Sequence, residues 1–215
     1  MTSARSTRGR RAARPTGDDR EGAILATAER LLGERSLRDI SIDDLAKGAG
    51  ISRPTFYFYF PSKDAVLLAL LDRVVQEADA ASTVVPDSHL AMDPARYWRD
   101  CIAAFYRTFR DHRAVTLACA EARCTNEEVR ALWASVMSVW TERAAEAIEA
   151  ERDRGAAPPG LPARDLAVAL SSMNERSMHA MFAGDEPSLA ESDVVTVLHT
   201  IWLNAIYHTT TPAGV

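Results

Sequence analysis

The chain of 215 residues has few cysteines and no long apolar run, and each shortage excludes a class of protein. Its three cysteines, Cys101, Cys119 and Cys124, are odd in number and irregularly spaced, which argues against a disulfide framework and favours buried thiols. No window approaches about eighteen uninterrupted apolar residues, so no membrane span is expected. The basic N-terminus lacks the apolar stretch of a signal peptide, so we expect a cytoplasmic protein.

The sequence also lacks catalytic and metal-binding patterns. No glycine-rich phosphate loop is present, and the histidines do not form an HExxH spacing. We therefore expect no enzymatic activity, no bound metal and no cofactor. The histidines are His89, His112, His179, His199 and His208.

Charge is distributed unevenly along the chain. The formal net charge is −5, yet residues 1–63 carry 12 basic and 8 acidic side chains, and the remainder carries 13 and 22. A positive N-terminal unit can meet DNA phosphates while an acidic body stays off the duplex. Residues 1–17 are predicted to form a disordered basic arm, in which Arg10, Arg11 and Arg14 are candidates for phosphate or minor-groove contact. The alternative is a solvated tail that touches nothing.

Helix-capping patterns precede apolar stretches of helical period throughout the chain. Alternation typical of strands is missing, apart from a doubtful Thr-Val-Val at 83–85. The sequence therefore predicts an all-α fold of nine helices with short loops. The expected helices cover about residues 16–32, 41–47, 52–60, 62–82, 94–111, 113–123, 125–152, 163–182 and 188–207.

Residues 41–60 have the pattern of a helix-turn-helix. Two short helices, predicted to be capped by Ser41 and Ser52, flank a glycine turn at 48–50. Phe56 and Phe60 are four residues apart, so both can face inward. The remaining aromatics of the second helix then face outward, which is rare in an isolated soluble domain and is explained by a surface that enters the major groove. The alternative is a small hydrophobic satellite core.

The outward positions suggest separate roles in reading and holding DNA. Thr55 can touch a base edge or a thymine methyl, and Arg53 can reach guanine or phosphate. Tyr57 and Tyr59 can donate their hydroxyls to phosphate, and Lys63 can hold a phosphate at a helix N-terminus. The candidate DNA-binding set is Arg10, Arg11, Arg14, Ser41, Ser52, Arg53, Pro54, Thr55, Tyr57, Phe58, Tyr59 and Lys63.

Large apolar side chains form stripes on the helices after residue 93. Such stripes usually belong to a packed core, but large rings on facing helices can also leave a tunnel for a ligand. Methionine lets such a wall adapt to different ligands. Asn174 is the one amide on these stripes, and it is either a satisfied core group or a polar handle for an apolar ligand. The stripes are Trp98, Ile102, Phe105 and Phe109; Trp133, Met137 and Trp140; Leu170, Asn174, Met178 and Met181; and Trp202 and Ile206.

The segment 50–63, Gly-Ile-Ser-Arg-Pro-Thr-Phe-Tyr-Phe-Tyr-Phe-Pro-Ser-Lys, resembles the helix-turn-helix of the TetR family of repressors. The resemblance implies a nine-helix fold in which the first three helices bind a double-stranded DNA operator. It also implies a homodimer formed through the last two helices. We therefore expect a helix-turn-helix domain at 18–62 and a ligand-binding and dimerisation domain at 63–210.

The segments 151–157 and 173–176 resemble one branch of this family. That resemblance implies a long apolar ligand tunnel, release of DNA by a small apolar ligand, and control of a flavin monooxygenase gene. The alternative is an architectural DNA-binding protein without a regulatory ligand. The candidate ligand-binding set is Trp98, Ile102, Phe105, Phe109, Trp133, Met137, Trp140, Asn174, Met178, His179 and Trp202.

Overall fold

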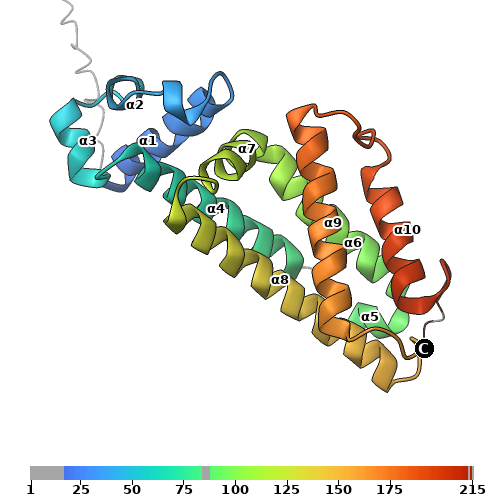
Figure 1. Cartoon of the computed structure of the whole chain (residues 1–215). Helices are drawn as coiled ribbons and strands as arrows, with labels where there is room; N and C mark the ends of the chain where they lie inside the picture. The colour runs from blue at the N-terminus through green and yellow to red at the C-terminus, as the bar shows by residue number, and fades with distance from the viewer. Residues whose placement is uncertain (1–16, 84–87, 213, 215) are drawn as a thin grey trace, which may run out of the picture.

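The computed structural model describes residues 17–83, 88–212 and 214, and the regular structure of these residues is helical. The N-terminal unit consists of α1 (Gly17–Leu32), the 3-10 turn η1 (Leu37–Asp39), α2 (Ile42–Gly48) and α3 (Arg53–Tyr59). Helix α4 (Lys63–Thr83) leads from this unit into the rest of the molecule, which we call the body (Figure 1).

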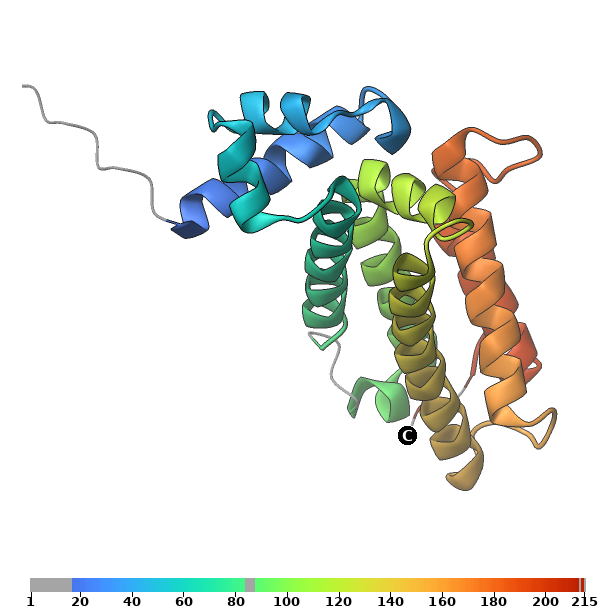
Figure 2. The same ribbon diagram turned by 60° about the vertical axis from the view of Figure 1, so that its left-hand side comes forward.

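The body contains the remaining helices, packed side by side. They are α5 (Ser88–Met92), α6 (Pro94–Asp111), α7 (Arg113–Ala122), α8 (Glu127–Asp153), α9 (Ala163–Ala183) and α10 (Val194–Tyr207). Helix α8 packs against α9, while α4 and α10 both pack against α6. The N-terminal unit sits at one end of the body, where α1 contacts α4 and α7 (Figure 1, Figure 2).

Short-range hydrogen bonds begin the helices of the N-terminal unit, as the sequence predicts. The Ser41 hydroxyl accepts from the backbone N–H of Asp44, and the Asp44 carboxylate accepts from the backbone N–H of Ser41, which forms a capping box. The Ser52 hydroxyl accepts from the backbone N–H of Thr55 at the start of α3. Pro54 lies in the first turn of α3, where the missing N–H costs nothing.

Two glycines make the turn between α2 and α3 possible. Gly50 has a φ of +67°, in the left-handed region that L-residues with a side chain rarely adopt. At Gly48 a methyl group would overlap the side chain of Thr27, so α2 can approach α1 this closely only with glycine. The predicted glycine turn is therefore confirmed, with a separate reason for each of its two glycines.

The number and bounds of the helices differ from the prediction at three places. The described residues contain ten α-helices, since the prediction of nine missed α5, whose five residues are too short to display a helical period. The last helix begins at Val194 and not at residue 188, because the N–H groups of Asp193 and Val194 form a turn onto the carbonyl of Ala190. Thr83 ends α4, so a strand beginning there is wrong, while residues 84 and 85 lie outside the described residues.

The prediction of buried thiols holds for one cysteine only. Cys119 on α7 is fully buried, and its burial raises the pKa of the thiol to about 12, so it stays protonated. Cys101 is partly exposed and Cys124 is exposed. In addition, none of the described helices is both long and apolar enough to cross a bilayer.

Candidate functional site

Helix α3 packs against the other helices of the N-terminal unit through one face of aromatic side chains. Phe56 is fully buried, and Phe60 just after the helix is 7% exposed, which confirms that both face inward. Their rings lie 6.2 Å apart, and both belong to the core that Leu45 of α2 and Ile24 of α1 also enter. The other face of α3 is therefore turned away from the core.

The outer face of α3 carries exposed aromatic and basic groups. Phe58 is 83% exposed and Tyr57 is 46% exposed. Arg53 Nη1 lies 3.4 Å from the Asp43 carboxylate, and Nη2 lies 3.5 Å from the Tyr57 hydroxyl. The Thr55 hydroxyl is 2.8 Å from the Ser52 hydroxyl. The contacts of Arg53 are exposed and contribute little stability. Arg53 can therefore leave them for another partner at small cost in free energy.

Two predicted DNA-binding residues are engaged within the protein. Tyr59 is half-buried and packs against the core. The Lys63 ammonium donates to the carbonyls of Leu37, Arg38 and Ile40 over 2.7, 3.1 and 3.2 Å, which uses all three of its N–H groups. Lys63 thereby ties the start of α4 to η1, and its phosphate contact stays a prediction that requires leaving one of these carbonyls.

The remaining candidates lie partly inside and partly outside the described residues. Ser41, Ser52 and Pro54 are exposed, at the start of α2 and of α3. The predicted arginines of the basic arm lie outside the described residues. These are Arg10, Arg11 and Arg14.

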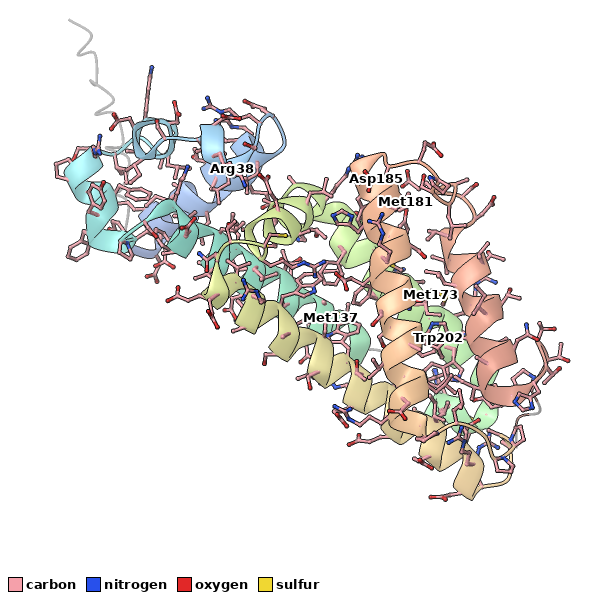
Figure 3. The ribbon with its side chains drawn as sticks, viewed as in Figure 1. Arg38, Met137, Met173, Met181, Asp185 and Trp202 are labelled. Atoms are coloured by element: carbon pink, nitrogen blue, oxygen red, sulfur yellow. The ribbon has the colours of Figure 1, made fainter. Side chains whose placement is uncertain are left out.

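The body contains a partly open cavity of about 790 Å³. Its walls come from α5, α6, α8, α9 and α10, and Met137 of α8 and Trp202 of α10 both line it (Figure 3). This volume lies within the range of small-molecule sites. Seven predicted ligand-binding residues line it: Trp98, Ile102, Phe105, Met137, Trp140, Asn174 and Trp202.

The other four predicted residues do not reach this cavity. They line a second space of about 20 Å³, room for about one water molecule. Phe105 lines both spaces. The four are Phe109, Trp133, Met178 and His179. The buried Nε1 of Trp133 has no hydrogen-bond partner among the described residues.

Asn174 is held in one orientation by a buried hydrogen bond. Its Oδ1 accepts from Trp202 Nε1 over 3.0 Å. Its Nδ2 makes no hydrogen bond to any described residue, and Asn174 lines the cavity. Asn174 is thus a core hydrogen-bond partner that also lines the cavity and keeps an amide group able to donate.

The cavity has a charged end that the sequence analysis missed. The stripe on α8 was followed only to Trp140, although the same helical face continues at intervals of three or four residues toward the end of α8. Continuing that period would have found the charged positions. The charged residues that line the cavity are Arg143, Glu146, Glu151 and Arg154.

A buried carboxylate organises this end of the cavity. Glu151 is 1% exposed, and its two oxygens accept from Arg154 Nε and Nη2 over 2.5 and 2.6 Å. Glu151 Oε2 also accepts from the Tyr207 hydroxyl over 2.7 Å, and Tyr207 in turn accepts from Trp98 Nε1 over 3.0 Å. Burial raises the pKa of Tyr207, and the Glu151 carboxylate raises it further, so the phenol remains a donor.

Comparison with known proteins places both halves of the chain. Residues 24–70 match the model of the TetR family of bacterial regulatory proteins, and residues 98–208 match the C-terminal domain of the transcriptional regulator EthR. EthR of Mycobacterium tuberculosis is 58% identical over 200 residues, which cover 93% of each chain. EthR of Mycolicibacterium smegmatis is 51% identical over 205 residues, which cover 95% of this chain and 94% of the relative.

The solved structures give the same assignment of fold. A TetR transcription regulator from Haloarcula marismortui superposes with a TM-score of 0.72 at 14% identity, over 91% of this chain and 100% of the other. The EthR relatives are helix-turn-helix transcriptional regulators, and the TetR family is not a family of enzymes. This agrees with the prediction of no enzymatic activity. The chain therefore belongs to the TetR family of bacterial transcriptional regulators, as a homologue of EthR.

Proposed function

We propose that the protein is a repressor that binds a palindromic DNA operator as a homodimer and releases it when a small apolar ligand fills the body. The DNA-binding unit would span residues 18–62, and the ligand-binding and dimerisation body residues 63–210. The observation that carries the proposal is the cavity of about 790 Å³ in a chain that also presents an exposed aromatic helix for DNA.

The outer face of α3 supplies the groups that read DNA. Phe58 and Tyr57 are exposed, as a major-groove surface requires. The guanidinium carbon of Arg53 lies 5.9 Å from the centre of the Tyr57 ring. Thr55 reads a base, while Tyr57 and the basic arm hold phosphates. Two copies of α3 in a dimer then dock on half-sites about 34–36 Å apart or a multiple of this distance.

The ligand is an apolar molecule with a hydrogen-bond acceptor. The Asn174 carbonyl oxygen is occupied by Trp202, which leaves the amide Nδ2 to donate. A ketone, ester or ether oxygen accepts from such a donor, and the aromatic walls cover the rest of the molecule. The second space, which Phe105 also lines, has room for no more than one small group of the ligand, such as a methyl.

Helices α9 and α10 are the proposed dimer interface. They lie side by side on the side of the body farther from α4 (Figure 1, Figure 2). Val168 on α9 and Ile201 on α10 are large apolar side chains with 41% and 40% exposure. Pairing each helix with its copy would bury both.

Helix α4 is the proposed route from the cavity to the DNA-binding unit. Arg143 lines the cavity from α8, and its Nη1 lies 2.5 Å from Asp79 Oδ1 on α4. A ligand that displaces the Arg143 side chain therefore acts directly on α4, whose first residue follows α3 by a short turn. The ligand must bind the released state better, since equal affinity for both states shifts nothing.

The test is a titration of a labelled duplex from the intergenic region beside the gene for this chain. A medium-chain alkyl ester should weaken DNA binding, and the alkane of equal length should do so less. Intrinsic tryptophan fluorescence reports occupancy, because Trp98, Trp140 and Trp202 line the cavity. Occupancy without any change in DNA affinity would contradict the proposal.

A matched variant tests the polar handle. Asn174→Leu should reduce the preference for ester over alkane by about tenfold, the effect of roughly one charge-free hydrogen bond, while DNA binding persists. An unchanged preference would reject this role. A footprint that spreads with protein concentration and ignores every ligand would instead favour an architectural protein. A monooxygenase gene next to the footprint would support the proposed target.

A further inference from the structure

Among the described residues, two side-chain ion pairs join the N-terminal unit to the rest of the molecule, and they differ in exposure. Arg38 of η1 lies 3.3 Å from Glu121 of α7, and the two side chains are 73% and 46% exposed (Figure 3). An exposed pair of this kind contributes little, because water screens it. The other contact is centred on His112, whose side chain is only 22% exposed.

His112 lies at the turn where α6 ends and α7 begins. Its Nδ1 is 2.5 Å from Glu29 Oε1 on α1, and its Nε2 is 2.9 Å from Glu77 Oε2 on α4. One imidazole ring thus connects α1 of the N-terminal unit, the connecting helix α4 and the α6–α7 turn. We call these three side chains the His112 latch.

The geometry of the latch requires a protonated ring. An ionised carboxylate only accepts hydrogen bonds, and a neutral imidazole has one N–H to donate. Both contacts can be hydrogen bonds at the same time only when His112 is an imidazolium. A neutral ring would set a lone pair against one carboxylate, which breaks the contact with α1 or with α4.

The electrostatic surroundings favour the charged ring. Burial lowers the pKa of His112, but the hydrogen bonds and negative charges of Glu29 and Glu77 outweigh it and raise the net pKa above 6.5. Asp111 and Arg113 flank the ring in the chain, and Asp111 is paired with Arg110 at 2.8 Å. Glu29 from α1 and Glu77 from α4 are therefore the groups that control it.

We propose that His112 is a positioning residue that, when protonated, fixes the DNA-binding unit relative to the body and so makes operator binding dependent on pH. The proposal rests on the proposed function, in which the spacing of two α3 helices decides operator affinity. Loss of the proton frees α1 from α4 or from the α6–α7 turn. A proton then acts as a second effector beside the ligand.

The sign of the effect on stability follows from the raised pKa. A group with a raised folded-state pKa stabilises fully below its unfolded value, and the stabilisation disappears as the pH rises through the folded value. The latch should therefore be closed below about pH 6.5 and open at mildly alkaline pH. The window of change lies above the ordinary histidine value.

The experiment compares the pH dependence of four full-length proteins between about pH 6 and 8.5. They are the wild type, His112→Gln, His112→Arg and the control His208→Asn. Arginine keeps a permanent cation that can donate to both carboxylates. His208 is exposed, and its backbone lies in the left-handed region with a φ of 58°, a conformation that asparagine tolerates. Each is titrated with the labelled intergenic duplex and unfolded by denaturant.

The operator dissociation constant of the wild type should change by roughly fivefold or more over this range. His112→Arg should bind DNA with a flat profile, while His112→Gln should lose both the change and the extra stability at low pH. His208→Asn should follow the wild type.

Equal pH profiles of wild type and His112→Gln in DNA binding and in unfolding would overturn the latch. A latch seen in unfolding but without any effect on DNA affinity would overturn its role in positioning. Failure of every variant to bind the duplex at any pH would instead contradict the proposed function, and the unfolding profile would still decide whether the latch exists.

Discussion

The N-terminal unit and the cavity of the body use polar side chains in opposite ways. In the N-terminal unit the polar groups that begin α2 and α3 are satisfied by neighbours three residues away, as in the capping box of Ser41 and Asp44. In the cavity several buried groups are satisfied over long distances in sequence: Trp98 donates to Tyr207, and Trp202 donates to Asn174. The first unit is therefore specified locally, whereas the second exists only after its helices have packed.

This difference separates stability from function in one region and joins them in the other. On α3 the buried face carries the stability and the exposed face is free for DNA, so the two can be changed independently. In the cavity the groups that would meet a ligand also hold the helices together, as Asn174 does by accepting from Trp202. Changes in the cavity should therefore alter stability and ligand response together.

The largest expected effect tests the two faces of α3 against each other. Phe56→Ala removes a fully buried ring and should cost about 3–5 kcal/mol in the free energy of unfolding. Phe58→Ala removes a ring that is 83% exposed and should change stability by no more than about 0.5 kcal/mol, yet weaken DNA binding. Denaturant unfolding and duplex titration of both variants check this. Similar losses of stability would refute the division of α3 into two faces.

An intermediate effect is expected at the charged end of the cavity. Tyr207→Phe removes the hydroxyl that donates to Glu151 and accepts from Trp98, so two buried groups lose a partner. The cost should be about 1–3 kcal/mol in unfolding free energy, with altered binding of the ester probe.

A matched tyrosine gives the control for this change. Tyr106→Phe removes a hydroxyl that donates to the exposed Glu191. This change should cost less unfolding free energy than Tyr207→Phe. If the two variants lose equal stability, the carboxylate of Glu151 does not organise the cavity as described.

The smallest expected effect separates reading from holding on α3. Thr55→Ala should cost about 1 kcal/mol in the free energy of binding to the matched site and less on scrambled DNA. The loss is small because the Thr55 hydroxyl is shared with the Ser52 hydroxyl and contacts a base weakly. Tyr57→Phe should weaken binding to both duplexes alike, because a phosphate contact carries no sequence information. Titration of each variant with matched and scrambled duplexes measures this. The assignment of roles fails if both variants affect the two duplexes in the same ratio.

Sequence reasoning predicted the N-terminal unit in detail because its determinants are short-range. Caps, the glycine turn and the i, i+4 pair of Phe56 and Phe60 all act within about one or two turns of helix. Lys63 was the exception: its carbonyl partners lie 23–26 residues earlier in the chain, and no local pattern indicates them. The start of the last helix was misplaced although its determinant is local, because a turn onto the carbonyl of Ala190 precedes the helix.

The cavity could be predicted only in outline. Helical stripes identified seven of its lining residues, but periodicity cannot tell which residues of a stripe enter which space. Phe109 and Trp133 therefore line the smaller space and not the cavity. The buried network of Glu151 joins α8, α10 and α6 across more than fifty residues, and only packing brings those groups together.

The central claim is that a ligand in the body changes the separation of the two α3 helices in a dimer. Spin labels at Glu34→Cys, an exposed position of the N-terminal unit outside the candidate DNA-binding set, would report this separation by pulsed electron paramagnetic resonance, in a background with Cys101→Ser and Cys124→Ser. On operator DNA the account predicts one distance consistent with half-sites about 34–36 Å apart, and a shift of several ångströms when the ester fills the cavity. A distance that stays the same while the ester occupies the cavity, or no distance between subunits at all, would contradict it.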